Sequence, residues 1–179
     1  SRTEVRLLWD SENLYVFFTA RDRDIMGYEK KRDGFTFNDD VLEVFLKPDI
    51  HGEGYCNFEI NVLDTVYDAF AAKESMPMER RWRQWDCKGL ETGAKIRGTL
   101  NDYTDEDELW TLELAIPFRS LPPCAGQPPQ PGDTWRVLFS RYDYSVYLEN
   151  GQELSASAPL SRPAFHATEE YGLMRFVKP

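Results

Sequence analysis

The sequence predicts an all-β protein, an antiparallel β-sandwich of the immunoglobulin or jelly-roll kind with long loops. Three features indicate this fold: short segments that alternate apolar and polar residues, turn-forming clusters between them, and no amphipathic helix of three turns. A sheet with one apolar face must cover that face, and a second sheet can do so. At 179 residues the chain suits one domain, residues 1–179. We expect helix below about 15%, against about 30% in typical domains.

Three hairpins account for most of the expected strands. VRLLWD and LYVFFTARD flank the turn residues SEN, VLEVFLK and YCNFEINVLD flank PDIHGEG, and LETGAKIRGTL and ELWTLELAIP flank the acidic loop NDYTDEDE. Further strands are expected at TVYDAF, TWRVLFSRYDY and YGLMRFV. The segment FRSLPPCAGQPPQPGD predicts a helical turn that its prolines end.

Two long segments lack strand periodicity. Residues 22–38 form a charged stretch, and loops of this length are usually functional or disordered. The second segment contains MERRWRQWDCKG, in which we expect Trp85 to pack in the core. Trp82 is then a candidate outer platform for a ligand.

Composition excludes several classes of partner. With 31 acidic and 21 basic residues the net charge is −10, and no basic stripe exists, so nucleic acid and anionic membranes would be repelled. No window reaches the 18 apolar residues of a membrane span, so membrane insertion is not expected. The chain enters a strand almost at once, so any signal peptide or N-terminal segment is expected upstream of it. Cys56, Cys87 and Cys124 permit at most one disulfide and are interpreted as partly buried apolar residues.

Two glutamates interrupt apolar strands. Side chains alternate along a strand, so Glu43 shares a face with Val41 and Phe45, and Glu59 shares one with Asn57 and Asn61. If the hairpin turns about His51, the numbers of paired residues sum to about 102, and Glu43 lies opposite Glu59. Both carboxylates then point to one face, where like charges destabilise the pair.

A bound polyol would offset that repulsion. Sugar hydroxyls donate to carboxylates, amides both donate and accept, and Val41 and Phe45 suit an apolar ring face. Two alternatives remain: the face is solvated, or Arg136 or Arg141 on a neighbouring strand pairs with the acids.

Six segments in order resemble the family 9 carbohydrate-binding modules, and through them the related DOMON-type sandwiches. They are VRLLWDSENLYVFFTARD, DDVLEVFLKPD, YCNFEINVLDTVYDAF, LWTLELAIPFRSL, GDTWRVLFSRYD and EEYGLMRF. The resemblance implies a β-sandwich that clamps a terminal sugar between two aromatic side chains and bonds it with acidic, basic and amide groups.

Carried over by position, the clamp falls on Phe37 and Phe165, where founding members have tryptophans. Glu43 matches a binding glutamate, Glu59 stands where those members have a binding arginine, and Arg162 stands near a binding asparagine. The remaining candidates for binding the ligand are Asn57, Asn61, Arg141 and His166.

Founding members also hold structural calcium, so calcium is a candidate ion although no cofactor is required. The acidic candidates are Asp22, Asp24, Asp39 and Asp40, and the alternative is a solvated acidic loop.

The sequence therefore predicts a non-catalytic module that binds a mono- or oligosaccharide, such as a chain end, with micromolar to millimolar affinity. We expect it to be secreted, periplasmic or on the cell surface, and linked to or associated with a glycoside hydrolase.

Two other functions are alternatives to sugar binding. A haem-binding electron-transfer domain would draw ligands from Met26, Met76, Met78, Met174, His51 and His166. A glycoside hydrolase would use Glu43 and Glu59 as its carboxylate pair, but no deep cleft that would raise the pKa of a general acid is evident from the sequence.

Overall fold

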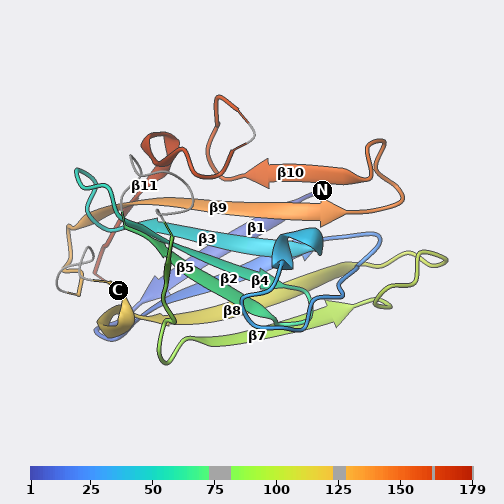
Figure 1. The fold of residues 1–179 in the computed structure, drawn as a ribbon, viewed down its shortest axis with the longest axis horizontal. Coiled ribbons are helices and arrows are strands. Elements are labelled where there is room, and N and C mark those ends of the chain that lie inside the picture. The colour runs from blue at the N-terminus through green and yellow to red at the C-terminus, as the bar shows by residue number, and fades with distance from the viewer. Residues whose placement is uncertain (73–81, 123–127, 163, 179) are drawn as a thin grey trace.

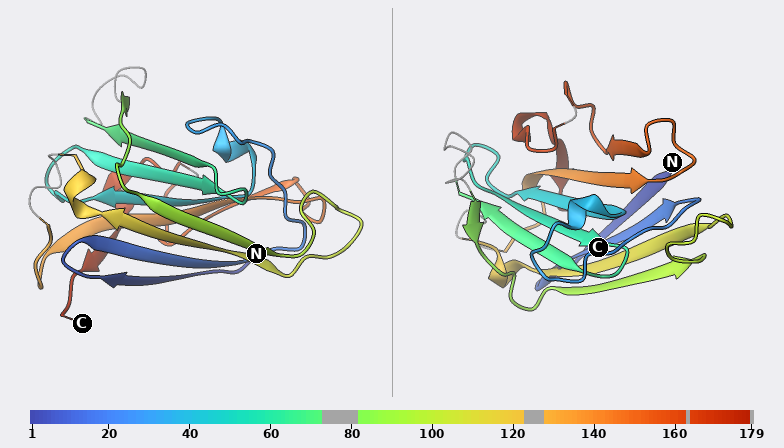
Figure 2. Two further views of the ribbon diagram at one scale, coloured as in Figure 1. Left: turned by 90° about the horizontal axis from the view of Figure 1, so that it is seen from below. Right: turned by 45° about the vertical axis from the view of Figure 1, so that its right-hand side comes forward.

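The computed structural model confirms an antiparallel β-sandwich, with 45% strand and 6% helix. It describes residues 1–72, 82–122, 128–162 and 164–178. One sheet has four strands in the order β1-β2-β8-β7, and the other contains seven. The view from below in Figure 2 shows the two sheets as separate layers.

The smaller sheet is formed by the first and third predicted hairpins. Strands β1 (Thr3–Trp9) and β2 (Asn13–Arg21) pair with each other, as do β7 (Glu91–Arg97) and β8 (Leu109–Pro117). Strand β2 also pairs with β8, which joins the two hairpins into one sheet.

The larger sheet has the order β10-β9-β3-β4-β5-β6, with β11 paired to β9 (Figure 1). Its strands are β3 (Val41–Lys47), β4 (Tyr55–Asn61), β5 (Val66–Ala71), β6 (Trp82–Gln84), β9 (Thr134–Tyr144), β10 (Gln152–Ala156) and β11 (Gly172–Arg175). The sequence did not predict β6 and β10, which are short. The described residues also contain three short 3-10 turns: η1 (Thr36–Asn38), η2 (Phe118–Ser120) and η4 (Thr168–Glu170).

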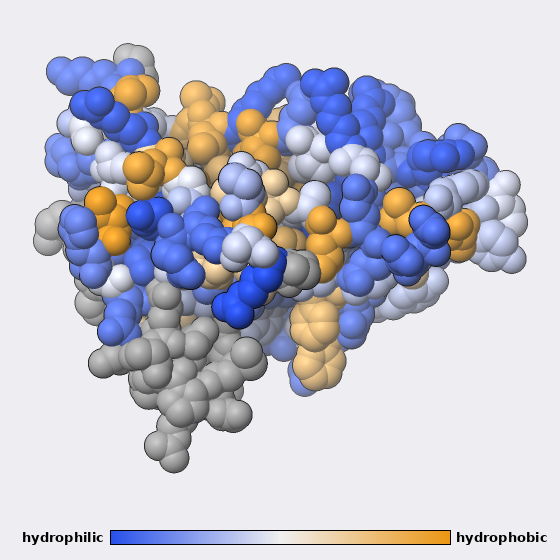
Figure 3. Space-filling model, turned by 90° about the horizontal axis from the view of Figure 1, so that it is seen from above, coloured by the Kyte–Doolittle hydropathy of each residue, from blue (hydrophilic) through white to orange (hydrophobic). Residues whose placement is uncertain are grey.

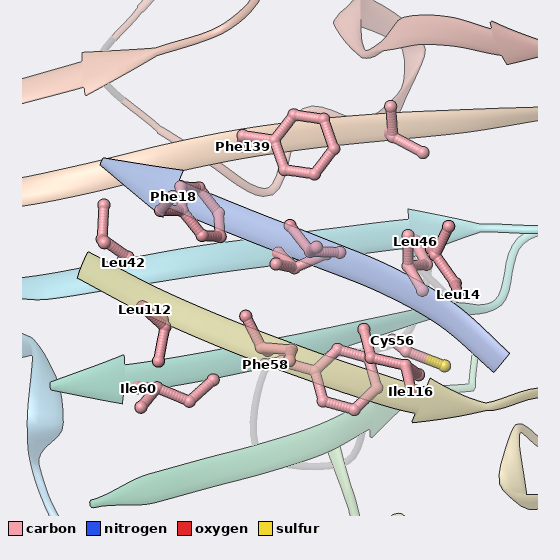
Figure 4. Close-up of a cluster of buried hydrophobic side chains, with 14 of the residues drawn as sticks. Leu14, Phe18, Leu42, Leu46, Cys56, Phe58, Ile60, Leu112, Ile116 and Phe139 are labelled. Carbon is pink, nitrogen blue, oxygen red and sulfur yellow. The ribbon is translucent and has the colours of Figure 1, made fainter. Parts of the chain in front are cut away.

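The main core lies between the sheets and follows the alternation of the strands. Leu42 and Leu46 of β3 and Phe58 and Ile60 of β4 face Leu14, Phe18, Leu112 and Ile116 of the smaller sheet (Figure 4). Trp85 packs on Phe58 with ring centroids 5.7 Å apart, as expected for a core residue. The side chain of Trp82 lies outside the described residues. Cys56 and Cys87 are buried, whereas Cys124 lies outside the described residues.

The outer face of the larger sheet is covered as well. All seven residues of β3 are buried, although only alternate ones face the core. A second apolar cluster on this outer face contains Phe45, Tyr55, Ala71, Leu138, Phe165 and Tyr171. The loop before β3 and the segment before β11 therefore cover this face, and the hollow between them is the candidate site.

Seen from above, hydrophobic residues form small groups between hydrophilic ones (Figure 3). Among the described residues, no helix has the length and apolar character needed to cross a membrane.

Candidate functional site

The floor of the site is a row of side chains across four strands of the larger sheet. Ser140 of β9 lies opposite Glu43 of β3, Glu43 opposite Glu59 of β4, and Glu59 opposite Tyr67 of β5. The predicted register, in which the paired numbers sum to 102, is confirmed. Successive residues of a strand point to opposite faces, so this row lies on the outer face, away from Leu42 and Phe58.

Both carboxylates are buried, with Glu43 2% and Glu59 8% exposed. Glu43 Oε2 accepts a hydrogen bond of 2.6 Å from the hydroxyl of Ser140, and Glu59 Oε2 accepts one of 2.9 Å from Thr36. With its nitrogen turned toward Glu59, the amide of Asn57 donates to Oε1 at 2.9 Å. The alternative of a fully solvated face does not fit this burial.

Burial governs the titration of the pair. Loss of water raises the pKa of Glu59 to about 7, although the hydrogen bond from Thr36 acts in the opposite direction. Burial also raises the pKa of Glu43 well above its usual value, and the neighbouring charge of Glu59 adds to this. Two close, desolvated carboxylates cannot both ionise cheaply, so the pair retains a proton near neutral pH.

Aromatic side chains surround this floor and enclose a pocket of about 440 Å³. Phe37 is 41% exposed and Phe35 67% exposed, and their rings lie edge to face with centroids 5.7 Å apart. The pocket is lined by Asp33, Gly34, Phe35, Phe37, Glu43, Phe45, Asn57, Glu59, Tyr67, Tyr142, Ala164, Phe165 and His166.

The two predicted clamp residues differ in exposure. Phe165 is only 6% exposed and packs against Phe45 and Tyr142, with centroids 6.4 and 5.5 Å away. It belongs to the outer apolar cluster and lines the pocket, whereas Phe37 presents more of its ring. A two-sided clamp stays a prediction.

The loop that carries Phe35 and Phe37 is fixed by Asn61. Its amide nitrogen donates to the Asp39 carboxylate at 2.7 Å and to the carbonyl of Glu29 at 2.8 Å. Asp39 in turn accepts the backbone N–H groups of residues 28 and 29. Asn61 does not line the pocket and is therefore a positioning residue, not the predicted sugar ligand.

The candidate arginines do not reach the pocket. Arg141 lies opposite Leu42, on the inner side of the sheet, where it pairs with Asp22 at 2.7 Å and Asp143 at 3.1 Å. Its candidacy is wrong because an odd-numbered residue of β9 faces the core, whereas Ser140 faces the glutamates. Arg136 donates to backbone carbonyls of residues 169 and 171, so it does not pair with the acids either. Arg162 is exposed and does not line the pocket.

His166 does line the pocket, where its Nδ1 lies 3.1 Å from the Tyr55 hydroxyl. Among the described residues, neither a methionine nor His51 lines the pocket with it. Met174 packs against the main core, and Met76 and Met78 lie outside the described residues.

A separate acidic cluster lies at the end of the sheet. Carboxylate oxygens of Asp22, Asp40 and Asp143 lie within 4.8 Å of one another, and all three residues are buried. Neither oxygen of Asp143 has a hydrogen bond among the described residues. Hard cations such as calcium prefer such oxygens, so the residues fit the calcium expected from the family resemblance.

The other acidic candidates have different roles. Asp24 accepts the N–H of Val146, and Asp39 accepts the hydrogen bonds of the loop. Asp143 was missed, because in the sequence it is one polar residue within an ordinary alternating strand.

A larger hollow, of about 620 Å³, lies on the outer face of the smaller sheet. Its acids, Glu91 and Glu113, are exposed, so it has no desolvated polar floor. The pocket over Glu43 and Glu59 is the stronger candidate, because it combines buried hydrogen-bonding groups with aromatic walls.

Sequence reasoning also missed the aromatic residues Phe35, Tyr67 and Tyr142. Tyr67 could have been found from the strand register, since it follows Glu59 along the row. The exposure of Phe35 depends on the loop conformation, which no periodicity encodes.

Solved structures with this fold include carbohydrate-binding proteins. A candidate carbohydrate-binding protein from Bacteroides uniformis is 18% identical, with a TM-score of 0.72, and the match covers 98% of this chain and 78% of that chain. A family 9 carbohydrate-binding module from Caldicellulosiruptor kristjanssonii in complex with cellotriose is 12% identical, with a TM-score of 0.63 and coverage of 99% and 76%. A family 9 module from the same organism in complex with glucose is 14% identical, with a TM-score of 0.60 and coverage of 98% and 78%.

A search of curated proteins finds no match. The family model described as carbohydrate family 9 binding domain-like, in contrast, matches residues 1–174, nearly the whole chain. Together with the sandwich fold, this assigns the chain to the carbohydrate family 9 binding domain-like family.

Proposed function

We propose that the protein is a non-catalytic module that binds a mono- or oligosaccharide in the pocket over Glu43 and Glu59. The observation that carries this proposal is the pairing of a buried polar floor with exposed aromatic rings in one hollow of about 440 Å³. Membership of a carbohydrate-binding family supports it. Sugars bound in two similar structures support it further.

The residues divide the work of binding. Phe37, with Phe35 beside it, offers ring surface to the apolar face of a sugar, and Phe165 forms the opposite wall of a clamp. The carboxyl groups of the floor and the Asn57 amide form hydrogen bonds with the hydroxyl groups of the sugar. Each hydrogen bond to a charged group contributes about 1.5–3 kcal/mol, against an association cost of several kcal/mol. We therefore expect affinities in the micromolar to millimolar range.

Catalysis is disfavoured by the placement of the two carboxylates. A glycosidase needs its two carboxyl groups on either side of the scissile bond. Here both point from adjacent strands into one floor, so a sugar above them meets both from the same side. We expect the protein to act outside the cytoplasm, linked to or associated with a glycoside hydrolase that supplies the chemistry.

A glycan array followed by calorimetry on the glycans that bind tests this function. We expect Phe37→Ala and Glu43→Gln each to weaken binding at least tenfold. The matched controls Tyr103→Ala and Glu113→Gln change an exposed aromatic residue and an exposed acid outside the pocket and should leave affinity unchanged. Binding that survives both pocket variants would place the site elsewhere, and an array without any bound glycan would refute the function.

We also propose that Asp22, Asp40 and Asp143 hold a structural calcium ion. Three carboxylates and the guanidinium of Arg141 carry a formal charge of −2 when all are ionised, which a divalent cation balances. The burial of three carboxylates beside a single guanidinium favours this assignment, because buried negative charge that is not balanced is costly.

A further inference from the structure

The glutamate pair has no cationic partner among the described residues. Neither Glu43 nor Glu59 makes an ion pair with a described lysine or arginine; their hydrogen bonds come from Ser140, Thr36 and Asn57. All three donors are neutral. The floor thus presents two carboxyl groups on directly opposed residues of adjacent strands, β3 and β4 (Figure 1).

Two cations of the surrounding elements are engaged elsewhere. Arg32 pairs with Asp68 and Asp86, and Lys47, on the same face of β3, donates to Thr168. No described lysine or arginine therefore balances the charge of the floor, which a cationic ligand would balance.

Other titratable groups around the pair do not supply that charge either. Asp33 from the loop is acidic, and burial raises the pKa of Tyr67 and of Tyr142 to about 12, so both phenols stay neutral at neutral pH. His166, from the segment before β11, is the one lining residue among those described that can become cationic, and its Nδ1 is engaged with the Tyr55 hydroxyl.

The walls suit a cation as well. Phe35, Phe37, Phe45 and Phe165 line the pocket with the two tyrosines. An ammonium group close to aromatic faces is attracted by their quadrupoles, and this attraction grows when water is excluded. A carboxylate floor below aromatic walls therefore matches an ammonium group attached to a ring with an apolar face.

We propose that the pocket selects amino sugars with a protonated amine, such as glucosamine and its oligomers, over neutral and acidic sugars. This inference rests on the sugar-binding function proposed above. The ammonium group would donate hydrogen bonds to Glu43 and Glu59, and charge-assisted bonds are roughly twice as strong as neutral ones. A uronic acid would instead place a third carboxylate above the pair and be repelled.

Binding of an amino sugar should also release a proton from the glutamate pair. Without a ligand the pair holds a proton near neutral pH, as argued above. An ammonium group favours the ionised form of both glutamates, so its binding transfers that proton to the buffer. A neutral sugar brings no positive charge, so the glutamate pair keeps its proton when such a sugar binds. Amino-sugar binding should accordingly tighten as the pH rises toward the range in which the pair ionises.

Calorimetry at about pH 6.5, where the sugar amine remains protonated, tests the inference. The ligands are glucosamine, N-acetylglucosamine as its neutral counterpart, glucose and glucuronic acid, each measured in two buffers of different ionisation enthalpy. We expect glucosamine to bind at least tenfold more tightly than the neutral sugars, with a heat that depends on the buffer. Glucuronic acid should bind most weakly, and the neutral sugars should show no dependence on the buffer.

Variants separate this inference from the proposed function. Glu59→Gln should reduce the preference for glucosamine over N-acetylglucosamine to below about threefold, whereas Glu113→Gln should leave it intact. Neutral sugars that bind as tightly as glucosamine would overturn the inference while sugar binding stands. A preference unchanged in Glu59→Gln would overturn it too. If none of the sugars binds, both the inference and the proposed function fail. Tetramethylammonium is measured as a further ligand, and if it alone binds, the pocket is reassigned to amines that are not sugars.

Discussion

Glu59 shows how a single residue can place function in conflict with stability. It stands in a strand between Phe58 and Ile60, and the fold buries it opposite a second glutamate. Hydrogen bonds from Thr36 and Asn57 satisfy it in part, yet burial still raises its pKa to about 7. A side chain that costs stability in the free protein is expected where a ligand offsets that cost.

The cost has a definite dependence on pH. The usual pKa of a glutamate is 4.5, and that of Glu59 in the folded state is about 7. Between these values the unfolded chain has lost its proton while the folded chain keeps it, so the free energy of unfolding falls as the pH rises through this window. We expect Glu59→Gln to reduce this fall by about 1–3 kcal/mol, because the amide carries no proton to lose.

Urea unfolding at pH 5 and at pH 8 measures the effect. Wild type should lose stability between the two values, in part also through Glu43, Asp22 and Asp40, whose pKa values are raised by burial. Glu59→Gln should lose less, and exposed Glu113→Gln as much as wild type. An identical loss in wild type and Glu59→Gln would show that Glu59 is already ionised at pH 5.

At the scale of elements, the sequence reveals the strands and their register better than it reveals the conformations of the loops. The three hairpins and the register of Glu43 opposite Glu59 could be predicted, because alternation along a strand fixes which face each residue occupies. Strand β10 was missed because its five residues follow a long connection and lack a strong apolar alternation.

The candidate site could be predicted only in its floor. The exposure of Phe35 and the burial of Phe165 follow from how two loops fold over the sheet. Tertiary hydrogen bonds set the conformation of these loops, and the alternation of apolar and polar residues does not reveal it. The side of the sheet occupied by Arg141 was in reach of the sequence, since its partner Leu42 faces the core.

One prediction concerns the loop before β3. Asn61 joins it to the sheet: its amide nitrogen bonds Asp39 and Glu29, and its oxygen accepts the N–H groups of residues 63 and 65 at 3.1 and 2.9 Å. Asn61→Ala leaves these buried groups without partners, so we expect a loss of about 2–4 kcal/mol in the free energy of unfolding. Amide exchange of residues 28 and 29, which bond to Asp39, should quicken.

Sugar binding should weaken in the same variant, because the loop carries Phe35 and Phe37. Exposed Asn38→Ala is the matched control in this loop and should change neither stability nor exchange by a measurable amount. Unaltered exchange at residues 28 and 29 in Asn61→Ala would mean that the backbone of the loop holds itself in place.

For the whole molecule, the acidic cluster links distant parts of the chain. Asp22 follows β2, Asp40 precedes β3 and Asp143 lies in β9, so one ion would tie the smaller sheet to the larger one. Arg141 already bridges the sheets there, since it donates to the carbonyl of Arg21 at 2.7 Å as well as to Asp22. A cation at this position stabilises only the folded state, because unfolding separates its ligands.

Calcium should therefore raise the melting temperature of the protein. At a free concentration of about 100 times the dissociation constant, binding adds about 2.7 kcal/mol, which for a domain of this size corresponds to roughly 5–10 °C relative to protein in a chelator. Asp143→Asn should abolish this rise and melt close to wild type in chelator, because the loss of its ion pair with Arg141 is offset by the relief of repulsion from Asp22 and Asp40. Exposed Asp105→Asn should keep the full rise. If calcium raises the melting temperature of Asp143→Asn as much as that of wild type, the ion binds elsewhere. If calcium does not raise the melting temperature of wild type, the cluster holds no calcium and Arg141 is its only positive charge among the described residues.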